Sequence, residues 1–228
     1  MPSFTPEEWT AIALSLRVAS VATLVALPLG VAAAWLLARC DFWGKSLFDA
    51  IVHLPLVLPP VVTGYLLLLS FGRKGWAGAF LADWLGVVFA FRWTGAALAC
   101  GVMGLPFLVR AARLSIEAVD PRLEAAASTL GAGRWRVFWT ITLPLALPGV
   151  LAGMVLCFAK ALGEFGATIT FVSNIPGETQ TLSSAIYTQV QTPGGDAAAL
   201  RLTLVAVALT VAALIASEYL SRRTRAWR

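Results

Sequence analysis

Residues 124–144 read EAAASTLGAGRWRVFWTITLP, and the interpretation of the whole chain starts from this stretch. A run of good helix formers ends at Gly131 and Gly133, and two arginines, Arg134 and Arg136, follow. Apolar sequence resumes at the Leu-Pro pair of residues 143–144. A short helix, a glycine stop and a basic turn predict an ordered loop at a membrane surface.

The composition indicates a membrane protein. Of the 228 residues, 59% are hydrophobic and only 13% are charged, and the mean hydropathy is +0.81. A soluble domain of this length needs more surface charge. The formal net charge of +5 does not indicate nucleic acid binding, because the basic residues lie in short segments between apolar runs. We therefore expect an all-α, polytopic bundle that forms one transmembrane domain over residues 1–228.

Five apolar runs are predicted to cross the bilayer, whose hydrocarbon core is about 30 Å thick. These runs are residues 18–38, 54–71, 93–109, 145–172 and 202–217. The segment 72–92 is rich in aromatic residues and is expected to be an interfacial connection or a short surface helix. The segment 173–197 is rich in turn residues and is expected to be a loop outside the bilayer.

Two of these runs are irregular. Pro55, Pro59 and Pro60 lie at the start of the second run, so either a broken helix lines a pathway there or a simple kink marks the membrane entrance. Lys160 and Glu164 lie within the fourth run, at a spacing that places both on one face of a helix. We expect them to pair, either beside a transport path or as an ion pair that only packs helices.

The loop also resembles a known element, the cytoplasmic coupling loop in the membrane subunits of bacterial ABC importers, here about residues 113–144. The positions that carry this resemblance are Glu124, Ala125, Ala126, Gly131, Ile141, Leu143 and Pro144. Elsewhere, HLPLVLPP at 53–60, GEFGAT at 163–168, NIPGET at 174–179 and QTPGG at 191–195 resemble the bacterial molybdate permeases. The similarity covers essentially the whole chain.

This resemblance implies a fold of the type I ABC importer kind and a transport function. The chain would be the permease subunit that moves molybdate from the periplasm to the cytoplasm, and the loop residues above would couple it to an ATPase. The implied partners are two copies of a cytoplasmic ABC ATPase subunit, a periplasmic molybdate-binding protein, a second copy of the chain and membrane lipid. Related importers of sulfate, thiosulfate or tungstate share much of the pattern and remain alternatives.

The basic residues favour one orientation in the bacterial inner membrane. If the 113–144 loop is cytoplasmic, most lysines and arginines lie on its side of the membrane, including the basic tail at residues 222–228. With five spans, the N-terminus is then periplasmic and the C-terminus cytoplasmic. The N-terminal segment is expected to be retained, because it is acidic where a secretory signal is basic.

The transported tetrahedral dianion must be bound weakly enough to be released. We therefore expect hydroxyl and backbone N–H donors along the path, with few unpaired charges. The candidate pathway residues, chosen by composition and by their place in the irregular runs, are Pro59, Pro60, Thr63, Lys160, Glu164, Thr168 and Thr170.

Two other classes of function have less support. A membrane-embedded enzyme needs a nucleophile with a base, or a metal set, and the sequence has one histidine with neither GxSxG nor HExxH. A passive channel would not need the coupling loop.

The turn Gly44-Lys45-Ser46 lacks the upstream glycine of a nucleotide-binding loop. We expect no cofactor or metal, and we expect ATP hydrolysis to occur in a separate subunit.

Overall fold

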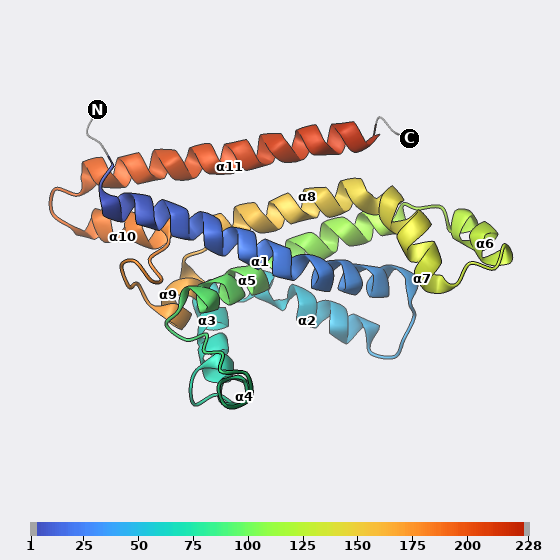
Figure 1. Ribbon diagram of the computed structural model, residues 1–228, viewed down its shortest axis with the longest axis horizontal. Coiled ribbons are helices and arrows are strands. Elements are labelled where there is room, and N and C mark those ends of the chain that lie inside the picture. Colours follow the sequence, from blue (N-terminus) through green and yellow to red (C-terminus); the bar gives the residue numbers. More distant parts are fainter. Residues whose placement is uncertain (1–3, 226–228) are drawn as a thin grey trace.

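The computed structural model describes residues 4–225, and these residues form helices without any strand. Long helices lie side by side along the long axis of the molecule (Figure 1). They are α1 (Pro6–Arg39), α5 (Trp93–Glu117), α8 (Leu143–Leu162) and α11 (Asp196–Arg225). Within the described residues, four helical stretches are long and apolar enough to cross a membrane. The expected all-α membrane bundle is therefore confirmed. Arg228, the last residue of the expected basic tail, lies outside the described residues.

Helix α1 begins well before the apolar run that predicted it. Thr5 Oγ1 accepts a hydrogen bond from the Glu8 N–H at 3.2 Å, and the Glu8 carboxylate accepts one from the Thr5 N–H at 2.8 Å. This reciprocal cap fixes the start of the helix. With 34 residues, α1 extends about 51 Å, which exceeds the hydrocarbon thickness of roughly 30 Å. Arg17 lies on this helix with its guanidinium carbon 3.8 Å from the centroid of the Trp93 ring.

The second expected span is a sharply bent pair of helices. Helix α2 (Lys45–Val57) and helix α3 (Pro60–Phe71) differ in direction by 117°. Leu58 and Pro59 separate them, and Pro60 is the first residue of α3, where its missing N–H costs no helical hydrogen bond. The proline run thus produces a break and not a simple kink. The bundle has a fifth candidate span only if α2 and α3 together count as one crossing.

The fourth expected span, the apolar run of residues 145–172, is also interrupted and does not form one continuous helix. Helix α8 ends at Leu162, and the next helix, α9 (Gly166–Val172), begins after a short break. Gly163 closes the last turn of α8 through its own N–H, which donates to the Ala159 carbonyl at 3.3 Å. Glu164 consequently lies in the break, beyond the helix that carries Lys160.

The segment 173–197 is not only a loop, as the sequence suggested, because it contains helix α10 (Leu182–Gln191). The turn residues on either side do form turns, as expected. The helix between them is stabilised by tertiary contacts. The Leu182 N–H donates to Ser15 Oγ of α1 at 2.6 Å. Leu182 and Ala185 also pack with Ala11 and Leu202 in one apolar cluster.

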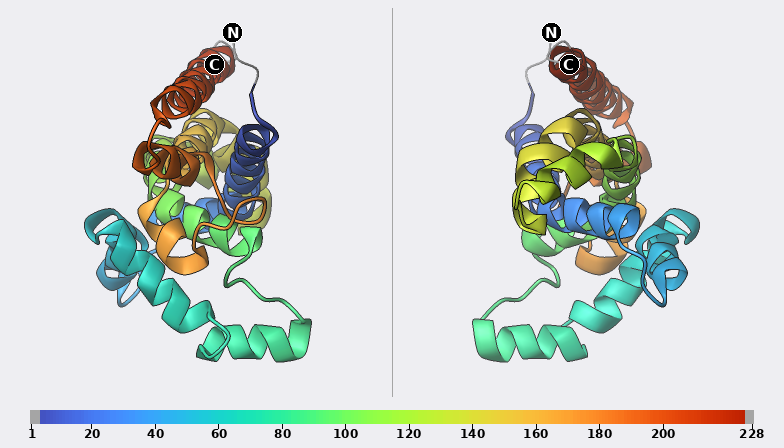
Figure 2. Two further views of the ribbon diagram at one scale, coloured as in Figure 1. Left: turned by 90° about the vertical axis from the view of Figure 1, so that its left-hand side faces the viewer. Right: turned by 90° about the vertical axis from the view of Figure 1, so that its right-hand side faces the viewer.

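The segment 72–92 contains the short surface helix that was expected, α4 (Trp76–Leu85). Figure 2 shows α3 and α4 projecting away from the bundle. Trp76 is 80% exposed and Trp84 is 78% exposed. The projecting helices therefore carry large apolar side chains that nothing in this single chain covers.

Helix α5 is the centre of the bundle and packs tightly against α1 and α8. Close approach to α8 depends on small residues. A Cβ added to Gly149 would lie 2.2 Å from Ser115 Cβ, and one added to Gly153 would lie 3.0 Å from the Leu108 carbonyl oxygen. The two helices can approach this closely only because these side chains are absent.

Candidate functional site

The 113–144 loop has the predicted form of a short helix, a glycine turn and a return to the membrane. Helix α6 (Pro121–Thr129) is capped by Asp120, whose carboxylate accepts a hydrogen bond from the Arg122 N–H at 2.9 Å. Gly131 has a φ of +84°, a backbone conformation that favours glycine. Helix α7 (Arg134–Val137) and the π-helix η1 (Phe138–Thr142) then lead into α8.

Glu124 joins three parts of the chain. Its carboxylate accepts hydrogen bonds from Arg39 Nε at 3.1 Å and from Thr142 Oγ1 at 2.7 Å. Arg39 also donates through Nη2 to the Val119 carbonyl at 2.9 Å. The end of α1, helix α6 and η1 are thus joined by one partly buried carboxylate. Sequence reasoning assigned Glu124 to a partner subunit and did not find these contacts within the chain.

The remaining positions that the resemblance assigns to coupling differ in exposure. Ala125, Ala126, Gly131 and Pro144 are exposed, whereas Ile141 and Leu143 are partly buried. No residue of α6 is buried.

Sequence reasoning missed two exposed leucines beside α6. Leu123 is 49% exposed and Leu130 is 89% exposed, although both belong to a loop beyond the long helices. Leucines that interrupt an otherwise polar loop were the signal that could have identified them. The loop therefore presents two large apolar side chains that this chain leaves uncovered.

The two helix breaks meet in space. A Cβ on Gly64 of α3 would lie 2.4 Å from the Ala167 carbonyl oxygen of α9, and one on Gly166 would lie 2.8 Å from Pro60 Cβ. Such close approach requires glycine on both helices. The structure therefore packs α3, which carries Pro60 and Thr63, against α9, which carries Thr168 and Thr170, although the sequence could only place them in separate runs. Glu164 is joined to the first turn of α9, and Lys160 is joined to Glu164.

Glu164 holds the second break together. Its side chain is only 1% exposed, and Lys160 Nζ donates to Oε2 at 2.5 Å. The other oxygen, Oε1, accepts from the Ala167 N–H in the first turn of α9 at 2.9 Å. The expected pair is present, but it connects the end of α8 to the start of α9 and does not lie on one helical face. Lys160 is 30% exposed and is the more accessible partner.

The three candidate threonines differ in the hydrogen bonds they make. Thr168 Oγ1 donates to the Phe165 carbonyl and Thr170 Oγ1 to the Gly166 carbonyl, each at 2.9 Å. Thr63 Oγ1 is buried and has no hydrogen-bond partner within the described part of the chain. Thr63 lines a pocket of about 180 Å³ between α2, α3 and α5. Of the three hydroxyls, that of Thr63 is therefore the one left to contact a ligand.

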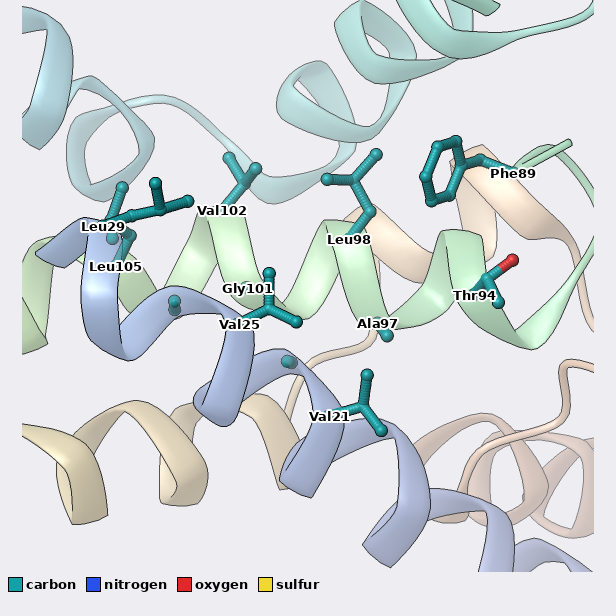
Figure 3. Close-up of a pocket in the computed structure, with 12 residues that line it drawn as sticks. Val21, Val25, Leu29, Phe89, Thr94, Ala97, Leu98, Gly101, Val102 and Leu105 are labelled. Atoms are coloured by element: carbon teal, nitrogen blue, oxygen red, sulfur yellow. The ribbon is translucent and has the colours of Figure 1, made fainter. Parts of the chain in front are cut away.

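A larger groove between α1 and α5 has different chemistry (Figure 3). Its volume is about 330 Å³, and it is lined by apolar side chains such as Val25, Leu98 and Val102. Thr94 lies at one end, and its buried hydroxyl has no partner among residues 4–225. A dianion would lose its hydration here without gaining donors, so this groove suits apolar packing and not oxyanion binding. No cluster of three or more His, Cys, Asp or Glu that could hold a metal occurs in the described residues.

Comparison with solved structures identifies the fold. The protein in the crystal structure of a bacterial alginate ABC transporter, in complex with its alginate-pentasaccharide-bound periplasmic protein, aligns with a TM-score of 0.75. The alignment covers 96% of this chain and 80% of that chain at 19% sequence identity. The helical arrangement is thus the fold of that ABC transporter chain, in agreement with the expected fold.

Sequence comparison identifies the family. The chain is 61% identical over 221 residues to the molybdenum transport system permease protein ModB of Escherichia coli (strain K12), covering 97% of this chain and 96% of that protein. It is 38% identical to the sulfate transport system permease protein CysW of Synechocystis, covering 92% of this chain and 77% of that protein. Residues 26–226 match the family model of the binding-protein-dependent transport system inner membrane component. The chain therefore belongs to this family of multi-pass inner membrane transport subunits, which are not enzymes themselves.

Proposed function

We propose that the chain is the permease subunit of an ATP-driven importer that moves molybdate from the periplasm to the cytoplasm. The observation that carries this proposal is the 61% identity to a molybdenum permease over nearly the full length of both proteins. Identity to the sulfate permease is lower, at 38%. Sulfate remains the second candidate because it is also a tetrahedral dianion, and tungstate is a third for the same reason.

The partner ATPase would dock on α6. Its exposed Ala125 and Ala126, together with Leu123 and Leu130, supply a surface that one chain leaves uncovered. Two ATPase copies would serve two permease chains. Glu124 would then transmit movement of α6, since its carboxylate is hydrogen-bonded to Arg39 of α1 and to Thr142 before α8. ATP binding would shift the permease between two conformations through these connections.

The orientation that we propose places the coupling loop in the cytoplasm, with a periplasmic N-terminus and a cytoplasmic C-terminus. The start of α1 lies at one end of the bundle, whereas α6 and the end of α11 lie toward the other (Figure 1). Termini on opposite sides require the bent α2–α3 pair to act as one crossing. The opposite end, which carries α10, would face the periplasmic molybdate-binding protein.

A second copy of the chain would complete the pathway. The outward side of α3 is apolar, with Val61, Tyr65 and Leu69 each more than half exposed. The same helix carries Thr63 and Gly64 on its buried side, next to α9. Packing a second copy against the projecting α3–α4 would cover this surface and enclose the two helix breaks between the protomers, with membrane lipid around the dimer.

Within that enclosure, the substrate would meet donors and few unpaired charges. Glu164 is neutralised by Lys160, so it would not repel a dianion strongly. Lys160 is partly exposed, and the Thr63 hydroxyl is free of protein partners in the described residues. We assign Thr63 and Lys160 as the first candidates for direct contact, while Glu164, Pro59 and Pro60 shape the breaks. Thr168 and Thr170, whose hydroxyls are already bonded, would contribute mainly to the shape of α9.

Competition for uptake tests the substrate assignment. The complete transporter, with its ATPase and binding protein, is reconstituted in vesicles, and uptake of labelled molybdate is measured with sulfate or tungstate as competitor. We expect unlabelled molybdate to compete far better than sulfate. A transporter that accumulates sulfate and ignores molybdate would refute the assignment while leaving the family intact.

A further inference from the structure

A second groove lies beside the coupling loop, between α1, α7, η1 and α8. Its volume is about 420 Å³, within the range of small-molecule sites, roughly 300–1,000 Å³. We call it the aromatic groove, and its lining includes Val31, Trp35, Trp135, Phe138, Trp139 and Leu147. It is separate from the helix breaks and from the groove in Figure 3.

The aromatic walls of this groove are ordered against one another. The Trp35 and Trp135 rings stack with centroids 6.1 Å apart, and Phe138 meets Trp35 edge-on at 5.9 Å. Trp135 is nevertheless 71% exposed and Trp139 62% exposed. Exposed tryptophans at the end of a membrane span are typical of the level where headgroups meet acyl chains.

The aromatic groove continues into a polar one. An adjoining pocket of about 540 Å³, lined by residues of α1, α6 and α7, shares Trp35 and Phe138 with it. The apolar part therefore opens directly into a polar part at these two rings. A ligand that fills both must itself be amphipathic.

Most of the charged side chains around the polar part are paired. Arg39 is paired with Glu124 at 3.1 Å, and Asp41 is paired with Lys45 at 2.9 Å. Arg134 also lines this pocket, is exposed and has no ion-pair partner among the side chains that the structure describes. Arg134 is thus a lining cation without a carboxylate partner among the described side chains, and it would attract an anionic group.

We propose that the aromatic groove binds an anionic phospholipid, with an acyl chain along Val31 and Leu147 and the phosphate beside Arg134. A free phosphate would make no contact with the apolar half of the groove. The exposed Arg134 favours an anionic over a zwitterionic headgroup. This site rests on the proposed orientation, which places the groove in the cytoplasmic leaflet, where anionic lipids attract basic residues. It does not depend on which oxyanion is transported. The lipid would contact the same η1 segment that Glu124 ties to the coupling helix.

Lipid retention by the intact complex tests this site. The permease with its ATPase is placed in nanodiscs of phosphatidylcholine with or without phosphatidylglycerol, and bound lipid is counted by native mass spectrometry after release. We expect selective retention of phosphatidylglycerol, and Arg134→Gln should weaken it about fivefold, the usual effect of one basic residue near an anionic surface. Arg122→Gln is the matched control, because Arg122 is an exposed arginine of the same loop outside both pockets.

A second variant tests the apolar half. Leu147→Trp should fill the groove and displace the acyl chain, whereas Leu204→Trp, at an exposed leucine of α11, should not. Equal retention of both lipids, or equal loss in Arg134→Gln and Arg122→Gln, would overturn the proposal. Retention of the lipid only by the permease without its ATPase would also overturn the proposal, because it would assign the groove to the interface with the ATPase. Because the readout is bound lipid, a failed substrate assignment would leave this result unaffected.

Discussion

Removing Lys160 and removing Glu164 should lower the stability of the protein by different amounts. Lys160→Met leaves the Glu164 carboxylate, only 1% exposed, with a single donor, the Ala167 N–H. Breaking a buried pair in this way costs about 3 kcal/mol of the free energy of unfolding. Glu164→Gln keeps an acceptor for the Ala167 N–H and leaves Lys160, 30% exposed, able to reach water, so it should cost only about 1 kcal/mol. The double variant should be more stable than Lys160→Met alone.

Unfolding of the detergent-solubilised chain by sodium dodecyl sulfate, followed by circular dichroism, measures these differences. A double-mutant cycle should give a coupling of at least about 1 kcal/mol. Lys45→Met is the matched control, since Lys45 pairs with Asp41 at the same sequence spacing but Asp41 is fully exposed; no measurable change is expected there. Additive effects, or a larger loss in Glu164→Gln than in Lys160→Met, would refute the reasoning.

Three further predictions follow from the loop and from the contact between the helix breaks. Gly64→Ala should destabilise the protein by about 1–3 kcal/mol through overpacking against Ala167, while Gly133→Ala, in open space at negative φ, should not; equal unfolding midpoints would contradict this. Gly131→Asp and Glu124→Arg should insert normally but uncouple ATP hydrolysis from transport, and normal uptake in vesicles by either variant would defeat the assignment. The purified chain alone should bind no ATP in equilibrium dialysis, whereas its complex with the ATPase should; binding by the isolated chain would disprove a separate ATPase.

Local signals predicted a large part of the fold. The apolar runs identified the long helices, and the glycines marked the end of α6, because helix ends are set by nearby residues. The proline run indicated either a break or a kink, and Pro59 and Pro60 produce a break of 117°. Helix α10 was missed because Ser15 and Leu202, distant in sequence, stabilise it.

The candidate site was predictable as a list of residues but not as an arrangement. The approach of Gly64 to Ala167 depends on how α3 and α9 cross, which no local pattern contains. The contacts of Glu124 with Arg39 and Thr142 are likewise tertiary. Through these contacts Glu124 connects α6 to α1 and η1, which its position on an exposed helix does not indicate.

Concentrative uptake is the most direct measurement of the central claim. Vesicles containing this chain, its ATPase and the binding protein are loaded with ATP on the ATPase side, and labelled molybdate is followed across the membrane. We predict accumulation above the external concentration, abolished when ATP is replaced by a non-hydrolysable analogue or when the ATPase is omitted. Accumulation by the chain alone, or equilibration that does not depend on ATP, would contradict the account.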